Sequence, residues 1–81
     1  MKDLVAYIVE SIVDEPEEVQ VVEVRDRAST IVELAVAAED MGRVIGKGGR
    51  VIDSIRTLIQ IRAAKDGKRV ELELLEAGDL R

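Results

Sequence analysis

The sequence predicts a two-layer α+β domain in which helices cover one face of a three-stranded mixed sheet. The expected elements follow the order α-β-β-α-α-β, and a chain of 81 residues has the length of one domain. Residues 69–75, RVELELL, alternate apolar and charged side chains, which is the pattern of a strand with one buried face. We therefore expect one layer of strands and one layer of helices.

Residues 3–13, DLVAYIVESIV, are expected to form the first helix, which should end before Pro16. Its broad apolar stripe comprises Leu4, Val5, Tyr7, Ile8, Val9, Ile12 and Val13. Tyr7 is the chain's one aromatic residue, and its place on this stripe predicts a core position rather than a base-stacking surface. An acidic cluster follows, which we interpret as a solvated connection rather than a cation site: Asp14, Glu15, Glu17 and Glu18.

Residues 19–25 and 30–37 are rich in β-branched side chains and predict two strands. The short break at residues 26–29 should make them an antiparallel hairpin. Val32, Leu34 and Val36 share one face of the second strand, which we expect at the centre of the sheet. The opposite face of the sheet is expected to be largely exposed.

Residues 39–45 predict a short helix with Asp40 near its N-cap, and residues 50–65 predict the clearest helix of the chain. The longer helix should end at Gly67, and its Asp53 should pair with Arg50 or Arg56. Its apolar positions comprise Ile52, Ile55, Leu58 and Ile59. Because two helices separate the second and third strands, these strands should be parallel. We place the domain at residues 1–76 and a short C-terminal tail at residues 77–81.

The composition lacks the residue types that most often bind metals or act in acid–base catalysis. The chain has neither cysteine nor histidine, so it lacks thiolate ligands, the commonest metal ligand and the commonest general base. No carboxylate pair flanks a plausible cleft motif, and we expect no enzymatic activity, no metal, no cofactor and no small-molecule substrate. The N-terminus lacks a basic n-region, and no apolar run approaches a membrane span. The expected location is therefore the cytoplasm.

Charge is segregated along the chain. The net charge of −5 would by itself argue against nucleic acid as a partner. Residues 41–69, however, have a net charge of +6, between segments of −8 and −3. Local charge dominates within a Debye length of about 10 Å, so this basic block could face phosphates, or it could simply solvate a helix.

Residues 43–52, RVIGKGGRVI, place three glycines between two expected helices. The Walker pattern G-x-x-x-x-G-K-S/T is not matched, because Met41 stands five positions before Gly46 and no hydroxyl residue follows the lysine. The dinucleotide pattern G-x-G-x-x-G fails as well, because its third glycine position is Val51 and a helix precedes it. Nucleotide hydrolysis and NAD binding are therefore not favoured.

The loop does match I-G-x-x-G-x-x-I, from Ile45 to Ile52, which is the signature of the KH domain. With the order α-β-β-α-α-β, residues 1–76 resemble a single type II KH domain. The chain further resembles the small bacterial single-KH RNA-binding proteins of the KhpA type in its segments VDEPE, EDMGRVIGK and IRT.

This resemblance implies a cytoplasmic bacterial protein that binds single-stranded RNA through its GxxG loop and an adjacent aliphatic groove. It implies a post-transcriptional regulator or RNA chaperone that forms a homodimer. It also implies a larger KH-containing partner of the Jag or KhpB type and a link to cell elongation, cell shape and cell division.

The residues support this site independently. Glycines without Cβ atoms let a nucleic-acid backbone approach, and the loop leads into a helix N-terminus, which favours phosphate. A bare helix–helix turn would explain one glycine or two, but not the surrounding cations. We assign RNA contact to Arg43, Gly46, Lys47, Gly48, Gly49 and Arg50, with Arg56 as a candidate extension. Four further cations could extend the footprint or only solvate the surface: Arg62, Lys65, Lys68 and Arg69.

Aromatic content separates the classes of binding module. The chain has no Phe, no Trp and one Tyr, which excludes the base-stacking platforms of RRM and OB-fold modules. The alternative to RNA binding is a protein-interaction or oligomerisation module, in which the acidic first half of one copy pairs with the basic block of another.

Overall fold

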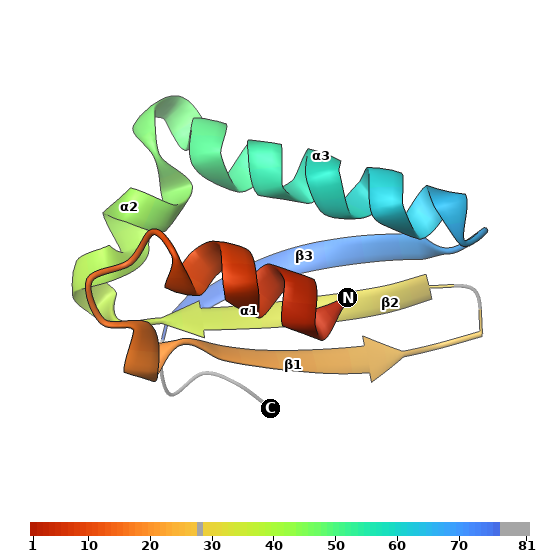
Figure 1. The fold of residues 1–81 in the computed structure, drawn as a ribbon, viewed down its shortest axis with the longest axis horizontal. Coiled ribbons are helices and arrows are strands. Elements are labelled where there is room, and N and C mark those ends of the chain that lie inside the picture. The colour runs from red at the N-terminus through yellow and green to blue at the C-terminus, as the bar shows by residue number, and fades with distance from the viewer. Residues whose placement is uncertain (28, 77–81) are drawn as a thin grey trace.

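The computed structural model describes residues 1–27 and 29–76 and confirms the two-layer α+β architecture (Figure 1). The helices and strands are α1 (Lys2–Glu10), β1 (Gln20–Arg25), β2 (Ser29–Val36), α2 (Met41–Ile45), α3 (Arg50–Lys65) and β3 (Arg69–Glu76). Short 3-10 turns lie at Pro16–Glu18, Ala38–Asp40 and Lys47–Gly49. The predicted tail at residues 77–81 lies outside the described residues. No helix within the described ranges has the length and apolar character needed to cross a membrane.

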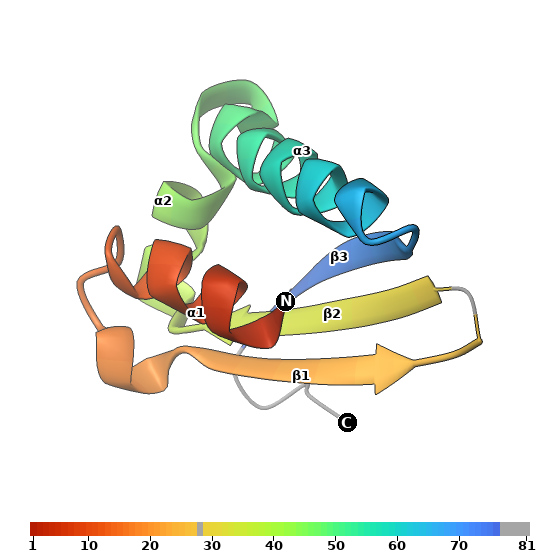
Figure 2. The ribbon, with the colours of Figure 1, turned by 45° about the vertical axis from the view of Figure 1, so that its right-hand side comes forward.

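The sheet has the predicted order and directions. Its strand order is β1-β2-β3, with β1 and β2 antiparallel and β2 and β3 parallel. The three helices lie on one face of it, with α1 over β1 and α3 over β3 (Figures 1 and 2). The loop between α2 and α3 therefore stands at one end of the helical layer, above the sheet.

The core lies between the two layers. Val32, Leu34 and Val36 of β2 are fully buried, as the alternation predicts. They pack against a cluster that includes Val5 and Val9 of α1 and, on α3 and β3, Ile52, Ile55, Ile59, Ala63, Val70 and Leu72. Burial of each large side chain contributes about 1.5–3 kcal/mol, so this cluster fixes α3 on the sheet.

Three residues at the apolar positions of the predicted helices are exposed. Leu4, Tyr7 and Leu58 are 38%, 72% and 55% exposed, so the predicted core position of Tyr7 was wrong. Successive helix residues differ by about 100°, and α1 turns Val5 and Val9 toward the sheet, which directs Tyr7 outward. On α3, Leu58 lies one position before Ile59 and falls beside the buried stripe.

The first helix ends at Glu10, three residues earlier than predicted. The backbone N–H groups of Asp14 and Glu15 instead donate to the carboxylate oxygens of Asp40, each at 3.0 Å. Asp40 stands at the N-cap position of α2 but makes no side-chain cap there. Asp40 therefore occupies the predicted position, but its carboxylate ties the chain after α1 to the base of α2 instead of capping the helix.

The second face of the sheet is less exposed than predicted. Glu33 and Ala35 of the central strand point to this face and are 1% and 0% exposed. In register, Glu33 lies between Val22 of β1 and Glu73 of β3. The expectation of a largely exposed face is therefore wrong at the centre of the sheet.

Candidate nucleic-acid interface

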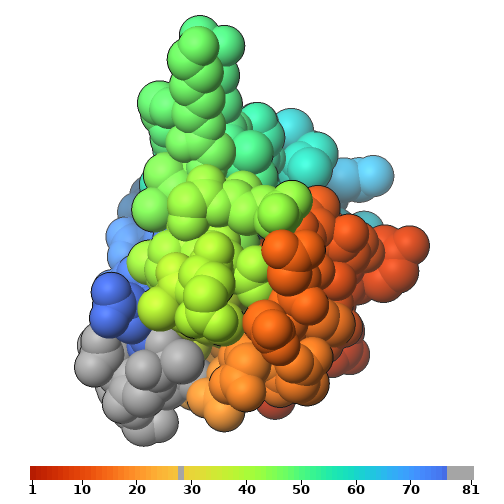
Figure 3. Space-filling view, turned by 90° about the vertical axis from the view of Figure 1, so that its left-hand side faces the viewer, coloured from red at the N-terminus to blue at the C-terminus, as the bar shows by residue number. Residues whose placement is uncertain are grey.

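The loop between α2 and α3 projects from the body of the molecule. Figure 3 shows it, in green, as a ridge above the sheet and the acidic connection after α1. Its three glycines, Gly46, Gly48 and Gly49, all have positive φ, at 75°, 63° and 78°. Backbone geometry thus requires all three, rather than the one or two expected of a bare turn. The number of glycines alone therefore does not indicate RNA contact.

Gly46 is held by packing as well as by conformation. Its φ of 75° and ψ of 173° lie in a region that is essentially restricted to glycine. A Cβ atom there would collide with Val51 Cγ2 and would lie 2.8 Å from Val51 Cβ and 2.9 Å from Val51 N. This glycine therefore brings the end of α2 directly against the first turn of α3.

The tip of the loop is open. Around a Cβ built at Gly48, no atom lies within 4 Å, so a ligand backbone can reach this position. Lys47 and Arg50 are exposed on either side, and neither forms an ion pair with any residue that the structure describes. The N-cap of α3, Gly49, provides no side-chain cap. The tip therefore combines two available cations with the positive end of a 16-residue helix.

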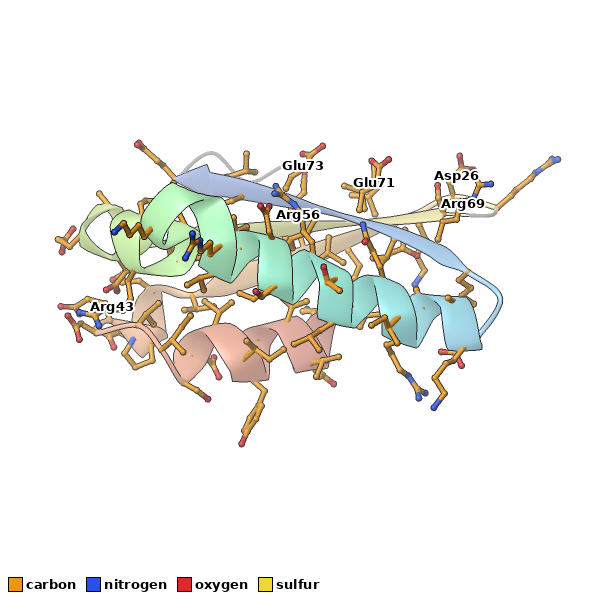
Figure 4. All side chains as sticks on the ribbon, turned by 90° about the horizontal axis from the view of Figure 1, so that it is seen from above. Asp26, Arg43, Arg56, Arg69, Glu71 and Glu73 are labelled. Atoms are coloured by element: carbon orange, nitrogen blue, oxygen red, sulfur yellow. The ribbon has the colours of Figure 1, made fainter. Side chains whose placement is uncertain are left out.

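Arg43 is not part of this tip. It extends from α2 toward the connection after α1, on the side away from α3 (Figure 4), where its Nη2 donates to Asp14 Oδ2 at 3.1 Å. Both side chains are more than half exposed, at 53% and 74%, so the pair contributes only about 0–1 kcal/mol. The structure thus separates Arg43 from Lys47 and Arg50, with which the sequence grouped it.

Arg56 bridges α3 and the edge strand β3 (Figure 4). Its Nη1 donates to Asp53 Oδ1 at 3.2 Å, which selects Arg56 over Arg50 as the partner of Asp53. Its Nε and Nη2 point to the carbonyl oxygen of Leu72, each at 3.4 Å. The guanidinium therefore lies on the α3–β3 seam, two turns from the loop tip.

A shallow depression follows the loop along α3. Its lining comprises Arg50, Asp53, Ser54, Thr57 and Leu58. Leu58 is its one aliphatic residue, but most of the exposed surface of the depression is apolar, which is compatible with the aliphatic groove that the resemblance implies. The guanidinium of Arg50 suits phosphate oxygens, whereas the hydroxyls of Ser54 and Thr57 donate to the backbone carbonyls of Arg50 and Asp53.

Acidic side chains gather around the connection after α1, below the loop. The hydrogen bond and the charge of Glu17 raise the pKa of Glu15 above its ordinary value, and the bond to Glu15 lowers the pKa of Glu17. Phosphates are repelled from this part of the surface. A polyanion at the loop is therefore directed toward α3.

Comparison with known proteins agrees with this fold. The family model described as "KhpA/KhpB, KH domain" matches residues 2–74. The chain belongs to the KhpA/KhpB KH-domain family. A Clostridium acetobutylicum protein named "RNA-binding protein KhpA" is 53% identical over 75 residues, which cover 93% of this chain and 100% of the relative. Proteins of the same name from Chlamydia pneumoniae and Borreliella burgdorferi are 47% and 43% identical, over 94% and 91% of this chain and 97% and 90% of their own lengths. No solved structure matches the chain.

In this KhpA/KhpB-family chain, the contacts that the sequence did not reveal join segments far apart along the chain. Asp40 contacts a backbone segment 26 residues away, and Arg43 contacts Asp14 across 29 residues. The acidic cluster was interpreted as solvated, and only its Asp14 and Glu15 make these contacts with α2 and its N-cap. No local sequence pattern marks such contacts, because they depend on how the connection after α1 lies against α2 and its N-cap.

Proposed function

We propose that this protein binds single-stranded RNA through the Gly46–Gly49 loop, with Lys47 and Arg50 contacting phosphates. The observation that carries the proposal is the open position at Gly48, flanked by two unpaired cations at the uncapped N-terminus of α3. The relatives' name, "RNA-binding protein KhpA", supports the same partner.

The loop would act on the RNA backbone. Gly48 admits a phosphate–sugar unit without a steric barrier, Lys47 supplies a charge at the tip, and the α3 dipole favours the phosphate. A KH loop clamps about four nucleotides. Bases leaving the clamp would lie along the first turns of α3, where Arg56 spans the seam to β3. Phosphate contacts of this kind position the strand, and only a mild base preference is expected.

The test is the double variant Lys47→Asp with Gly48→Asp. We expect it to remain folded by circular dichroism and to lose most of its affinity for a single-stranded RNA. The matched control carries the same change of −3 at exposed positions of the acidic end: Ser11→Asp, Gln20→Asp and Ala38→Asp. Unchanged RNA affinity in the folded loop variant would refute the proposal. Equal losses of RNA affinity in the loop variant and the control would show that net charge, and not the loop, determines binding.

We also propose that the protein acts as a homodimer. Leu58 and Ile61 are 55% and 57% exposed on α3, and Tyr7 is 72% exposed on α1. Such side chains suit a protein contact, and joining two weak RNA sites raises effective affinity without new contacts. Sedimentation of Leu58→Ser with Ile61→Ser should give a monomer. An unchanged dimer would exclude this face of α3 as the interface.

The wider role is proposed from the family resemblance. It comprises a larger KH-containing partner of the Jag or KhpB type, action in the cytoplasm as a post-transcriptional regulator or RNA chaperone, and control of cell elongation and division. Crosslinking with sequencing of the bound RNA, from cells with and without the loop variant, tests whether RNA contact underlies that role. A loop variant that loses oligomers but keeps RNA binding would favour the protein-interaction alternative.

A further inference from the structure

The end of the molecule opposite the loop carries a second group of basic side chains. We name it the distal basic end, and it comprises Arg25, Arg27, Arg62, Lys65, Lys68 and Arg69. It lies where the β1–β2 hairpin meets the turn between α3 and β3, on the right of Figure 1. Because α3 has 16 residues and rises about 1.5 Å per residue, about 22 Å separates this end from the loop.

Segments far apart in the sequence build this end. The sheet register places Arg25 opposite Thr30, and Ser29 beside Arg69. Two adjoining hollows share Arg25, Thr30 and Lys68 in their lining, and the larger, of about 170 Å³, also includes Arg62. Arg25 and Arg27 therefore join Arg62, Lys65, Lys68 and Arg69, from which more than 30 residues of sequence separate them.

Most of the charge at this end is available. Glu23 pairs with Arg25 at 3.1 Å, and Asp66 lies 3.7 Å from Arg62. Asp26 accepts the backbone N–H of Arg27. Four cations form no ion pair within the described part of the chain: Arg27, Lys65, Lys68 and Arg69.

The stretch of α3 that connects the two ends carries no net negative charge. Between the loop and the distal basic end, α3 has Asp53 as its one acidic residue, and Arg56 pairs with it at 3.2 Å. On β3, by contrast, Glu71 and Glu73 point outward, away from α3 (Figure 4). A strand of negative charge leaving the loop therefore meets less repulsion along α3 than over the outer side of β3.

We propose that the distal basic end is a second phosphate-binding site, at which an RNA held by the loop continues along α3. This inference rests on the proposed function. RNA is favoured over a protein partner because cations dominate this end, and among the large exposed apolar side chains of the described residues only Ile61 adjoins it, whereas Leu4, Tyr7, Ile45 and Leu58 do not. Protein interfaces depend on buried apolar and aromatic anchors, whereas sequence-independent phosphate binding depends on Lys and Arg.

The geometry sets a length requirement. A stacked strand advances about 3.4 Å per nucleotide, so about six or seven nucleotides span the ~22 Å along α3. Added to the four nucleotides of the clamp, this makes an RNA of about ten nucleotides the shortest that engages both sites. The two ends are separated by more than a Debye length of about 10 Å, so charge removed at one end has little effect at the other.

The experiment compares two RNA lengths and two variants. The distal variant is Lys68→Gln with Arg69→Gln, and its control, Ser11→Asp with Gln20→Asp, changes the net charge by the same −2. The probes are unstructured RNAs of about 4 nucleotides, which fill only the clamp, and about 16 nucleotides, which exceed the required length. Titrations at several salt concentrations give both the affinity and its salt slope.

The distal variant should bind the longer RNA at least about tenfold more weakly and lower its salt slope by about 1.4, or 0.7 for each lost phosphate contact. The short RNA should bind it unchanged, and the control should resemble the parent protein. Equal affinity of parent and distal variant for the longer RNA would overturn this inference, while the loop variant would still test the proposed function. An equal loss for the short RNA, or a change in oligomer mass with RNA binding intact, would also overturn it.

Discussion

Replacing Gly46 and Gly48 separately by alanine should distinguish the structural glycine of the loop from the accessible one. At Gly46, the backbone occupies a region in which other residues cost about 1–3 kcal/mol. The new methyl group also meets Val51 Cβ at 2.8 Å and Val51 N at 2.9 Å, and overpacking of this kind costs about 1–3 kcal/mol. The expected loss of unfolding free energy for Gly46→Ala is therefore about 2–6 kcal/mol.

At Gly48, the same substitution meets no atom within 4 Å. Its φ of 63° and ψ of 22° are left-handed helical, a conformation that costs alanine about 1–2 kcal/mol. A domain of 81 residues has a total stability of about 4–12 kcal/mol. Gly46→Ala should therefore unfold a large part of the population, whereas Gly48→Ala should stay folded.

Urea unfolding followed by circular dichroism measures this difference. The midpoint should fall much further for Gly46→Ala than for Gly48→Ala, with an unchanged denaturant slope if the unfolded state is the same. RNA binding by the folded Gly48→Ala variant should be weakened, because the methyl group occupies the open tip. Equal destabilisation by the two substitutions would refute the packing of α2 against Val51 as the reason for Gly46.

Three further predictions concern the body of the domain. Asp40→Asn should lower the free energy of unfolding by about 1.5–3 kcal/mol in urea, because one of two charge-assisted hydrogen bonds is lost. A loss below about half a kcal/mol would show that these hydrogen bonds do not stabilise the fold. For Glu23, burial raises the pKa, but the Lys2 N–H, Arg25 and the terminal amine outweigh it and lower the pKa below 4.5. The stability from Glu23 should thus be present above pH 4.5 and lost below it, and Glu23→Gln should flatten this part of the pH–stability curve. Leu34→Ala should cost about 2–5 kcal/mol by thermal or urea unfolding, and a smaller cost would mean that the core collapses around it.

The features predicted correctly from the sequence are those that local pattern determines. Residues 50–65 form α3 as predicted, because a long run with helical spacing and a glycine stop leaves few alternatives. Gly67 and Lys68 donate to the carbonyls of Ala64 and Ala63 at its end, which is the expected C-terminal motif. The directions of the strands followed from the lengths of their connections.

The features that were missed depend on contacts between distant segments. The early end of α1 results from Asp40, 26 residues beyond the backbone that it holds. The spacing of Tyr7 matches the apolar stripe in the sequence, but the packing of Val5 and Val9 against the sheet determines which face of α1 is buried. Arg43 stands near the glycine loop in sequence, whereas its side chain pairs with Asp14 on the side away from α3. The spacing of residues in the sequence does not predict the end of α1, the exposure of Tyr7 or the ion pair of Arg43.

The structure also resolves the conflict between an acidic chain and an anionic partner. Several acidic side chains are engaged within the fold: Asp14, Glu23, Asp40, Asp53 and Asp66 hold backbone N–H groups or arginines. The cations at the loop tip and at the distal end have few such partners. The net charge of −5 therefore averages an acidic end, whose carboxylates partly serve the fold, with a helix whose positive charge is available. Since electrostatic attraction acts over about 10 Å, an approaching strand would respond to α3 and not to that average.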